Sequence, residues 1–179
     1  NIIMSNETAT NSSTFTPPTS DILDQTEEHI DRETLIITLF LLHEWSKGTA
    51  SQWYLYLQLL PQKFSTSLCH QENYLENTLA FYLTQSMRQS MTAVFDLVAS
   101  RICKLEDFLW AYTIITSRTF KLTELGTVLI PLADLANHVS FAREASLYAV
   151  GIDKQTDRFI FKATDREIIK GQEVCSKYN

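Results

Sequence analysis

Residues 110–120, WAYTIITSRTF, and residues 128–138, VLIPLADLANH, decide how this chain is interpreted. In both stretches, apolar runs alternate with hydrogen-bonding side chains, namely Arg118, Asp134, Asn137 and His138. Each buried charge or amide that lacks a partner costs on the order of 1 to 3 kcal/mol. The pattern therefore predicts that something polar is bound there.

A structural explanation of the same residues stays open. Asp134 caps a turn in that explanation, Asn137 adopts the left-handed conformation, and His138 is a half-buried ring with its hydrogen bonds satisfied. Spacing alone does not decide between the two.

Hydrophobic periodicity predicts helices over the first two thirds of the chain. Residues 8–20 are rich in Ser, Thr and Pro and predict a surface loop. The stripe in residues 75–103, which includes Leu83 and Met91, predicts a helix with one face on a core. The other predicted helices are residues 21–42 with Asp31 as a cap, residues 50–60 ended by Pro61, and a helix from Leu105 to Arg118.

After Gly126 the periodicity shortens to that of strands. The predicted strands are residues 127–130, 147–152, 158–164 and 172–178, with a hairpin loop at 153–157 and a turn at Lys170–Gly171. The expected order is a helical block followed by a compact β block.

Composition excludes some classes of partner. The 179 residues are about one domain, and a formal charge of -6 argues against direct contact with nucleic acid. No apolar run approaches the roughly 20 residues that cross a membrane. Three cysteines, Cys69, Cys103 and Cys175, lack C-x-x-C spacing, which fits a reducing compartment, and we predict no metal site. We expect a cytoplasmic and/or nuclear protein.

Four ordered motifs resemble those of one enzyme family. The two opening stretches are similar to W-A-x-x-x-x-x-S-R-x-F and (L/V)-x-P-x-x-D-x-x-N-H of SET-domain protein methyltransferases of the Rubisco large-subunit methyltransferase type, the group that includes the actin-histidine methyltransferase. The end of the chain resembles the family's K-G-x-E-V-x-x-x-Y. Upstream, L-x-x-E...S-x-W-x-x-Y-x-x-x-L-P is matched by Leu42, Glu44, Ser51, Trp53, Tyr56, Leu60 and Pro61.

The resemblance implies an α+β fold, a SET domain of small β-sheets with a pseudoknot that carries a large α-helical insertion. It divides the chain into a remnant of the N-terminal SET lobe and a loop (1–20), the helical insertion (21–125) and the C-terminal SET lobe (126–179). The family's N-terminal G-x-G turn is not found before Gly48, so we expect an internal fragment that lacks this lobe.

The resemblance also implies roles for single residues. Arg118 would pair with the carboxylate of S-adenosyl-L-methionine, Asn137 and His138 would hold its adenine and amino-acid ends, and Asp134 would brace the turn. Tyr178 would be the catalytic tyrosine that orients the incoming nitrogen. Tyr148 lies near an aromatic position around the target nitrogen and is the predicted substrate-binding residue. Val139, where Ser is usual, and Asn179, where Gly or Asp is common, depart from the family.

The implied function is S-adenosylmethionine-dependent methylation of a protein nitrogen by in-line transfer, most simply of lysine, with histidine as a possible target. The expected partner is a protein substrate, histone or non-histone, without direct nucleic acid or membrane contact. The alternative is a catalytically inactive SET-like module for protein interaction.

Overall fold

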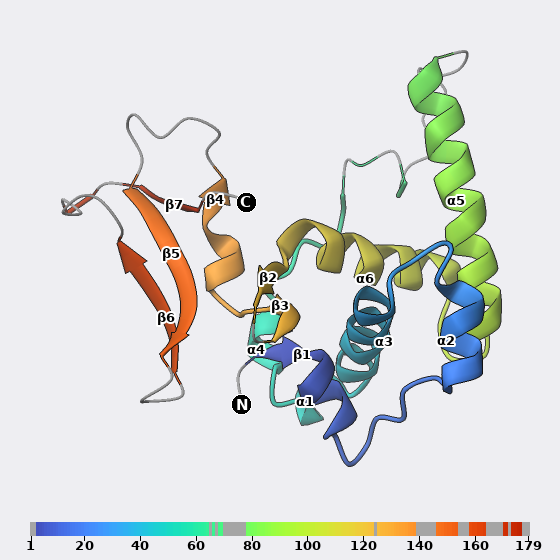
Figure 1. The fold of residues 1–179 in the computed structure, drawn as a ribbon, viewed down its shortest axis with the longest axis horizontal. Coiled ribbons are helices and arrows are strands. Elements are labelled where there is room, and N and C mark those ends of the chain that lie inside the picture. The colour runs from blue at the N-terminus through green and yellow to red at the C-terminus, as the bar shows by residue number, and fades with distance from the viewer. Residues whose placement is uncertain are drawn as a thin grey trace. The chain divides into compact units, whose positions relative to one another are not determined.

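A computed structural model describes residues 3–64, 66, 68–69, 78–123, 125–138, 146–153, 158–163, 170–171 and 173–176. These residues form two compact units, 1–129 and 130–179. Figure 1 shows the helices and strands of both units. No helix in the described ranges is long and apolar enough to cross a membrane.

Unit 1 consists of helices built around α3 and one small sheet. Its helices are α1 (Asn6–Thr10), α2 (Ser20–Thr26), α3 (Arg32–Ser46), the 3₁₀ turn η1 (Gly48–Ala50), α4 (Tyr54–Leu57), α5 (Leu79–Val98) and α6 (Leu105–Arg118). The sheet has the order β1 (Met4–Ser5), β3 (Gly126–Leu129), β2 (Phe120–Leu122), and both pairings are antiparallel. The two ends of unit 1 therefore meet in one sheet.

The core of unit 1 lies between α3 and α6. Asp31 caps α3 by accepting a hydrogen bond from the Thr34 backbone N–H at 3.0 Å, as its sequence position predicts. Ten residues of α3 are buried, so this helix is covered on nearly every side. Phe40 packs edge-on against Phe15 and Trp53, with ring centroids 5.4 Å away in both cases.

Helix α5 corrects the prediction for residues 75–103. Only Met91 and Val94 of its C-terminal half are buried, whereas Leu79, Leu83 and Met87 are exposed. Figure 1 shows the N-terminal half of α5 extending beyond the other helices of unit 1, which gives the stripe no partner surface among the described residues of that unit. Periodicity predicted the helix correctly but not its burial.

Three other segments also differ from expectation. The single helix expected over residues 21–42 is divided into α2 and α3, because Asp31 caps a new helix there. Residues 8–10 belong to α1, because Ser5 and Thr8 form a capping box that starts a helix there. The helix expected over residues 50–60 shrinks to η1 and α4, although the side chains of Trp53, Tyr56, Leu57 and Leu60 are buried as predicted.

Unit 2 contains a four-stranded sheet in the order β4, β7, β5, β6. Its elements are the 3₁₀ turn η3 (Ala133–Leu135), β4 (Asn137–His138), β5 (Ser146–Asp153), β6 (Arg158–Ala163) and β7 (Val174–Ser176). Strands β5 and β6 form the antiparallel hairpin that the alternation predicts, while β7 runs parallel to both β4 and β5. The parallel neighbours β4 and β7 bring two distant motifs together.

Candidate functional site

Helix α6 carries the first motif on a rigid support. Trp110 donates a hydrogen bond from its indole Nε1 to the carbonyl oxygen of Pro61 at 2.8 Å. The ring centroids of Trp110 and Trp45 are 4.8 Å apart. Ala111 is fully buried, in the helix that packs on α3. Arg118 is the last residue of α6 and is half-buried. The rest of the motif thus fixes the helix that presents Arg118.

The second motif forms a tight turn in unit 2. Leu132 has φ of 73°, the only positive φ of a non-glycine residue in the described ranges. Asp134 is buried in η3, and its backbone N–H donates to the Ile130 carbonyl oxygen at 3.2 Å. The structural explanation that placed the left-handed residue at Asn137 is therefore wrong, because Asn137 belongs to strand β4.

The second and third motifs meet in the sheet of unit 2. Asn137 and His138 on β4 pair in parallel with Cys175 and Ser176 on β7. Asn137 Nδ2 donates to Glu173 Oε1 at 2.5 Å, a bond between residues 36 positions apart. Asn137 is exposed, and its carboxamide oxygen is a hydrogen-bond acceptor. Burial, followed by the charge of Glu173, raises the pKa of the Cys175 thiol.

The remaining predicted residues are placed only in part. Tyr148 lies on β5 opposite Ala163 of β6, and His138 is placed by its backbone pairing alone. Tyr178 lies outside the described residues, two positions after the end of β7. Arg118 belongs to unit 1, whereas Asp134, Asn137, His138 and Tyr148 belong to unit 2. The roles assigned to these residues stay predictions.

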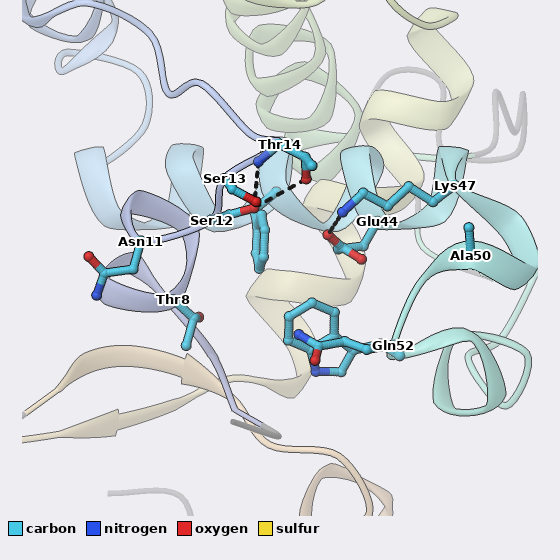
Figure 2. Close-up of a pocket in the computed structure, with 11 residues that line it drawn as sticks. Thr8, Asn11, Ser12, Ser13, Thr14, Glu44, Lys47, Ala50 and Gln52 are labelled. Atoms are coloured by element: carbon cyan, nitrogen blue, oxygen red, sulfur yellow. Dashed lines mark hydrogen bonds and ion pairs between the residues drawn. The ribbon is translucent and has the colours of Figure 1, made fainter.

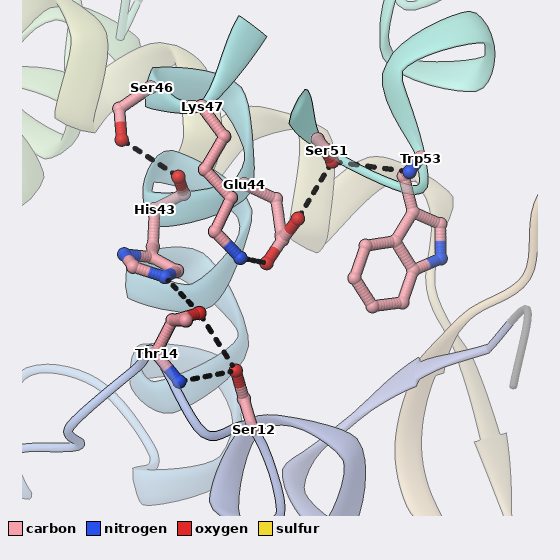
Figure 3. Close-up of polar contacts among 8 residues, drawn as sticks. All are labelled: Ser12, Thr14, His43, Glu44, Ser46, Lys47, Ser51 and Trp53. Carbon is pink, nitrogen blue, oxygen red and sulfur yellow. Dashed lines mark hydrogen bonds and ion pairs between the residues drawn. The ribbon is translucent and has the colours of Figure 1, made fainter. Parts of the chain in front are cut away.

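The polar residues of the fourth motif form a buried network at the end of α3 (Figure 3). The side chain of Glu44 is only 2 % exposed, and both of its oxygens are used. Lys47 donates to Oε1 and Ser51 Oγ donates to Oε2 at 2.7 Å. Ser51 Oγ in turn accepts the Trp53 backbone N–H at 3.1 Å. This motif therefore closes the connection between α3 and α4 rather than presenting a reactive group.

A second polar chain joins this helix to the loop after α1. His43 Nε2 lies 3.1 Å from Thr14 Oγ1, which is 3.4 Å from Ser12 Oγ. Burial and then the charge of Lys47 lower the pKa of His43, and the Glu44 carboxylate opposes this in part. The ring thus stays neutral to a lower pH than an exposed histidine.

The two networks flank a pocket of about 470 Å³ in unit 1 (Figure 2). Its lining consists of hydroxyl and carboxamide groups, the Lys47–Glu44 pair and two aromatic rings, contributed by Thr8, Asn11, Ser12, Ser13, Thr14, Phe40, Glu44, Lys47, Ala50, Gln52 and Trp53. The two opposite charges cancel, and neither a cysteine nor a histidine lines it. The pocket has room for a small uncharged polar group, and no predicted site residue lies among its lining.

Sequence reasoning left out two residues of the candidate site. Glu173 was counted as part of a motif but not as the partner of Asn137, although both motifs were visible and only their pairing was missing. Leu132 gave no signal at all, because leucine is rarely found at positive φ. A residue held in that conformation marks a turn that the surrounding structure fixes.

Comparison with known proteins gives a consistent set of relatives. The chain is 35% identical over 118 residues to the chloroplastic [fructose-bisphosphate aldolase]-lysine N-methyltransferase of Arabidopsis thaliana, covering 57% of this chain and 24% of that protein. It is 27% identical over 169 residues to the ribosomal lysine N-methyltransferase set10 of Schizosaccharomyces pombe, covering 80% of this chain and 28% of that protein. The chain thus spans about a quarter of the length of these curated relatives. No protein-family model matches it.

The fold matches a solved structure over nearly the whole chain. The SET domain of LSMT bound to lysine and AdoHcy superposes with a TM-score of 0.73 at 20% sequence identity, covering 99% of this chain and 42% of the other. This likeness confirms the predicted α+β fold of the SET type. In sequence, the chain is similar to lysine N-methyltransferases, and in fold it is similar to the SET domain of LSMT.

Proposed function

We propose that this chain is part of an S-adenosylmethionine-dependent protein N-methyltransferase that modifies lysine most simply, with histidine as a possible target. The observation that carries the proposal is the pairing of β4 with β7, which joins the N-H motif to the strand that leads to Tyr178. The relatives support lysine as the target, since those in Arabidopsis thaliana and Schizosaccharomyces pombe are both lysine N-methyltransferases.

The side chains at the site fit the chemistry of the cofactor. A guanidinium pairs with a carboxylate through charge-assisted hydrogen bonds, which suits Arg118 for the methionine end of S-adenosylmethionine. The carboxamide of Asn137, which carries both a hydrogen-bond donor and an acceptor, suits the polar groups of S-adenosylmethionine. When bound, the cofactor supplies a methyl group on a sulfonium. In this proposal, Asp134 braces the η3 turn that precedes Asn137 and His138.

The chain's contribution to the reaction is mainly positioning. The target nitrogen attacks the methyl carbon in line with the carbon–sulfur bond, and it must be neutral to do so. Holding the two atoms near 3 Å supplies several kcal/mol, on the order of 7 to 11 in well-oriented intramolecular reactions. In this proposal, the hydroxyl of Tyr178 orients the nitrogen and Tyr148 lies beside it.

Calorimetric titration of the chain with S-adenosylmethionine tests the proposal. We expect saturable binding that weakens about tenfold or more in Arg118→Ala and in Asn137→Ala, because each loses a polar contact to the ligand. The matched controls are Arg101→Ala and Asn11→Ala, which remove exposed residues of the same types elsewhere in unit 1. Equal loss in a control and its test variant would contradict the assigned roles.

The alternative of a catalytically inactive interaction module has one observation in its favour. Helix α5 exposes apolar side chains, with Leu79 and Leu83 exposed by 74% and 62%. Exposed apolar surface of this kind is typical of protein contacts. A folded chain that does not bind S-adenosylmethionine would favour this alternative.

The proposal includes a protein as the substrate and a location in the cytoplasm and/or nucleus. The location is supported by the sequence, because Cys69, Cys103 and Cys175 are an odd number without C-x-x-C spacing, which fits a reducing compartment.

A further inference from the structure

A carboxylate from the start of α3 holds the start of strand β3. Glu33 Oε2 accepts a hydrogen bond from the Thr127 backbone N–H at 2.9 Å, across 94 positions of sequence. The neighbouring Gly126 has φ of +68°, and a Cβ at that position would overlap the Glu33 carboxylate. Gly126 therefore leaves the space that the carboxylate fills.

The contact replaces a strand partner that is missing at this point. Strand β1 pairs with Val128 and Leu129 only, and the chain turns into α1 at Asn6, one residue short of Thr127. A buried backbone N–H without an acceptor is costly, so the carboxylate continues the edge where β1 stops. Thr127 is itself buried.

Strand β3 in turn holds the segment that follows Arg118. Strand β2 begins at Phe120, two residues after Arg118, and among the described residues it pairs only with β3. A three-residue edge strand has little stability of its own. The path of the backbone after Arg118 thus depends on the position of β3, because β3 holds β2 in place.

We propose that Glu33 is a positioning residue for Arg118. Its carboxylate fixes the β2–β3 hairpin against the first turn of α3, and the hairpin fixes the end of α6 at which Arg118 would meet the carboxylate of S-adenosylmethionine. This inference rests on the proposed function. It assigns Glu33 no contact with the ligand.

The test compares three single variants for affinity, stability and local order. Glu33→Ala removes the contact, and Glu33→Gln keeps an oxygen that can accept the Thr127 N–H. Asp31→Ala is the matched control, since the Asp31 carboxylate caps the same end of α3 by accepting the Thr34 N–H, whereas the Glu33 carboxylate accepts the Thr127 N–H of the hairpin. Affinity for S-adenosylmethionine is measured by calorimetry, melting temperature by circular dichroism, and amide hydrogen exchange at residues 118–128 by NMR.

We expect Glu33→Ala to bind S-adenosylmethionine about tenfold more weakly and to exchange faster along β2 and β3. Glu33→Gln should recover most of the affinity. Asp31→Ala should lower the melting temperature and leave the affinity unchanged. Gly126→Ala tests the contact from the strand side and should weaken binding in the same way as Glu33→Ala.

Three results would overturn the inference. These are unchanged affinity in folded Glu33→Ala, equal loss of affinity in Asp31→Ala, and no recovery in Glu33→Gln. If the wild-type chain itself does not bind S-adenosylmethionine, the proposed function fails. Hydrogen exchange then tests separately whether Glu33 fixes the β2–β3 hairpin. Unchanged exchange along β2 and β3 in Glu33→Ala would overturn it.

Discussion

Helices α3 and α5 are both rich in apolar residues, yet they have opposite environments. Ten of the 15 residues of α3 are buried, against two of the 20 residues of α5. Charge does not explain the difference, because α5 carries only Arg88 and Asp96. The composition of a helix therefore does not decide how much of it is buried.

The difference comes from the number of neighbours. Helix α3 packs against α1, α4, α6, β1 and β3, so that each of its faces meets another element. Among the described elements of unit 1, helix α5 packs mainly against α2 and α6. In its C-terminal half the ring of Phe95 packs at a tilt against that of Phe108, with ring centroids 5.9 Å apart. Burial is thus a property of the assembly, which periodicity within one helix does not report.

Large-to-small substitutions should give the largest difference in unfolding free energy between a change in α3 and a change in α5. Phe40→Ala in α3 removes a ring that is 1% exposed and lies between Phe15 and Trp53, so we expect it to lose about 3 to 5 kcal/mol of unfolding free energy. Leu83→Ala in α5 should change it by less than about 0.5 kcal/mol, because its side chain is exposed. Urea denaturation followed by tryptophan fluorescence measures both. Similar losses would mean that α5 is covered in solution.

Substitution of a serine should give a smaller difference in unfolding free energy between the end of α3 and α5. Ser51→Ala removes one of the two partners of the buried Glu44 carboxylate at the end of α3, together with the hydroxyl that accepts the Trp53 backbone N–H. We expect a loss of about 1 to 3 kcal/mol. Ser86→Ala in α5 is the control, and it should be neutral or slightly stabilising, because Ser86 is exposed and alanine favours helix. A neutral Ser51→Ala would show that water replaces the hydroxyl.

Local rules predicted the elements of this fold better than their contacts. The cap at Asp31 and the hairpin of β5 and β6 follow from side chains close in sequence, and both are present. Strands β1 and β2 were missed, since two- and three-residue strands contain too little alternation to detect. Their pairing with β3 depends on segments that lie up to 125 positions apart, such as Met4 and Leu129.

The sequence predicted residues for the candidate site but not their contacts, and the roles of these residues stay predictions. The motifs pointed to Arg118, Asp134, Asn137 and His138, and the resemblance supplied their roles. Neither source indicated that Glu173 would bind Asn137 or that Leu132 would take positive φ. Both features arise where distant segments meet, so spacing along the chain does not encode them.

The smallest expected effect is the loss of stability at low pH. It should come from a histidine in α3 and not from α5. The half-buried His43 of α3 has a lowered pKa, caused first by burial and then by Lys47, whereas α5 contains no histidine. The folded protein therefore favours the neutral ring, while the unfolded chain takes up a proton near the ordinary value of about 6.5. The stabilisation is complete above that pH and is lost as the pH falls through the lower folded-state pKa.

Urea denaturation at several pH values between 7 and 5 measures this effect in the wild type and in His43→Gln. Loss of the Thr14 contact lowers the variant's stability equally at every pH, so the informative quantity is the change with pH. We expect the wild type to lose more stability on acidification than His43→Gln, because other groups contribute equally to both. Parallel curves would mean that His43 titrates alike in the folded and unfolded chains, and the burial at this end of α3 would then be too shallow to affect a charge.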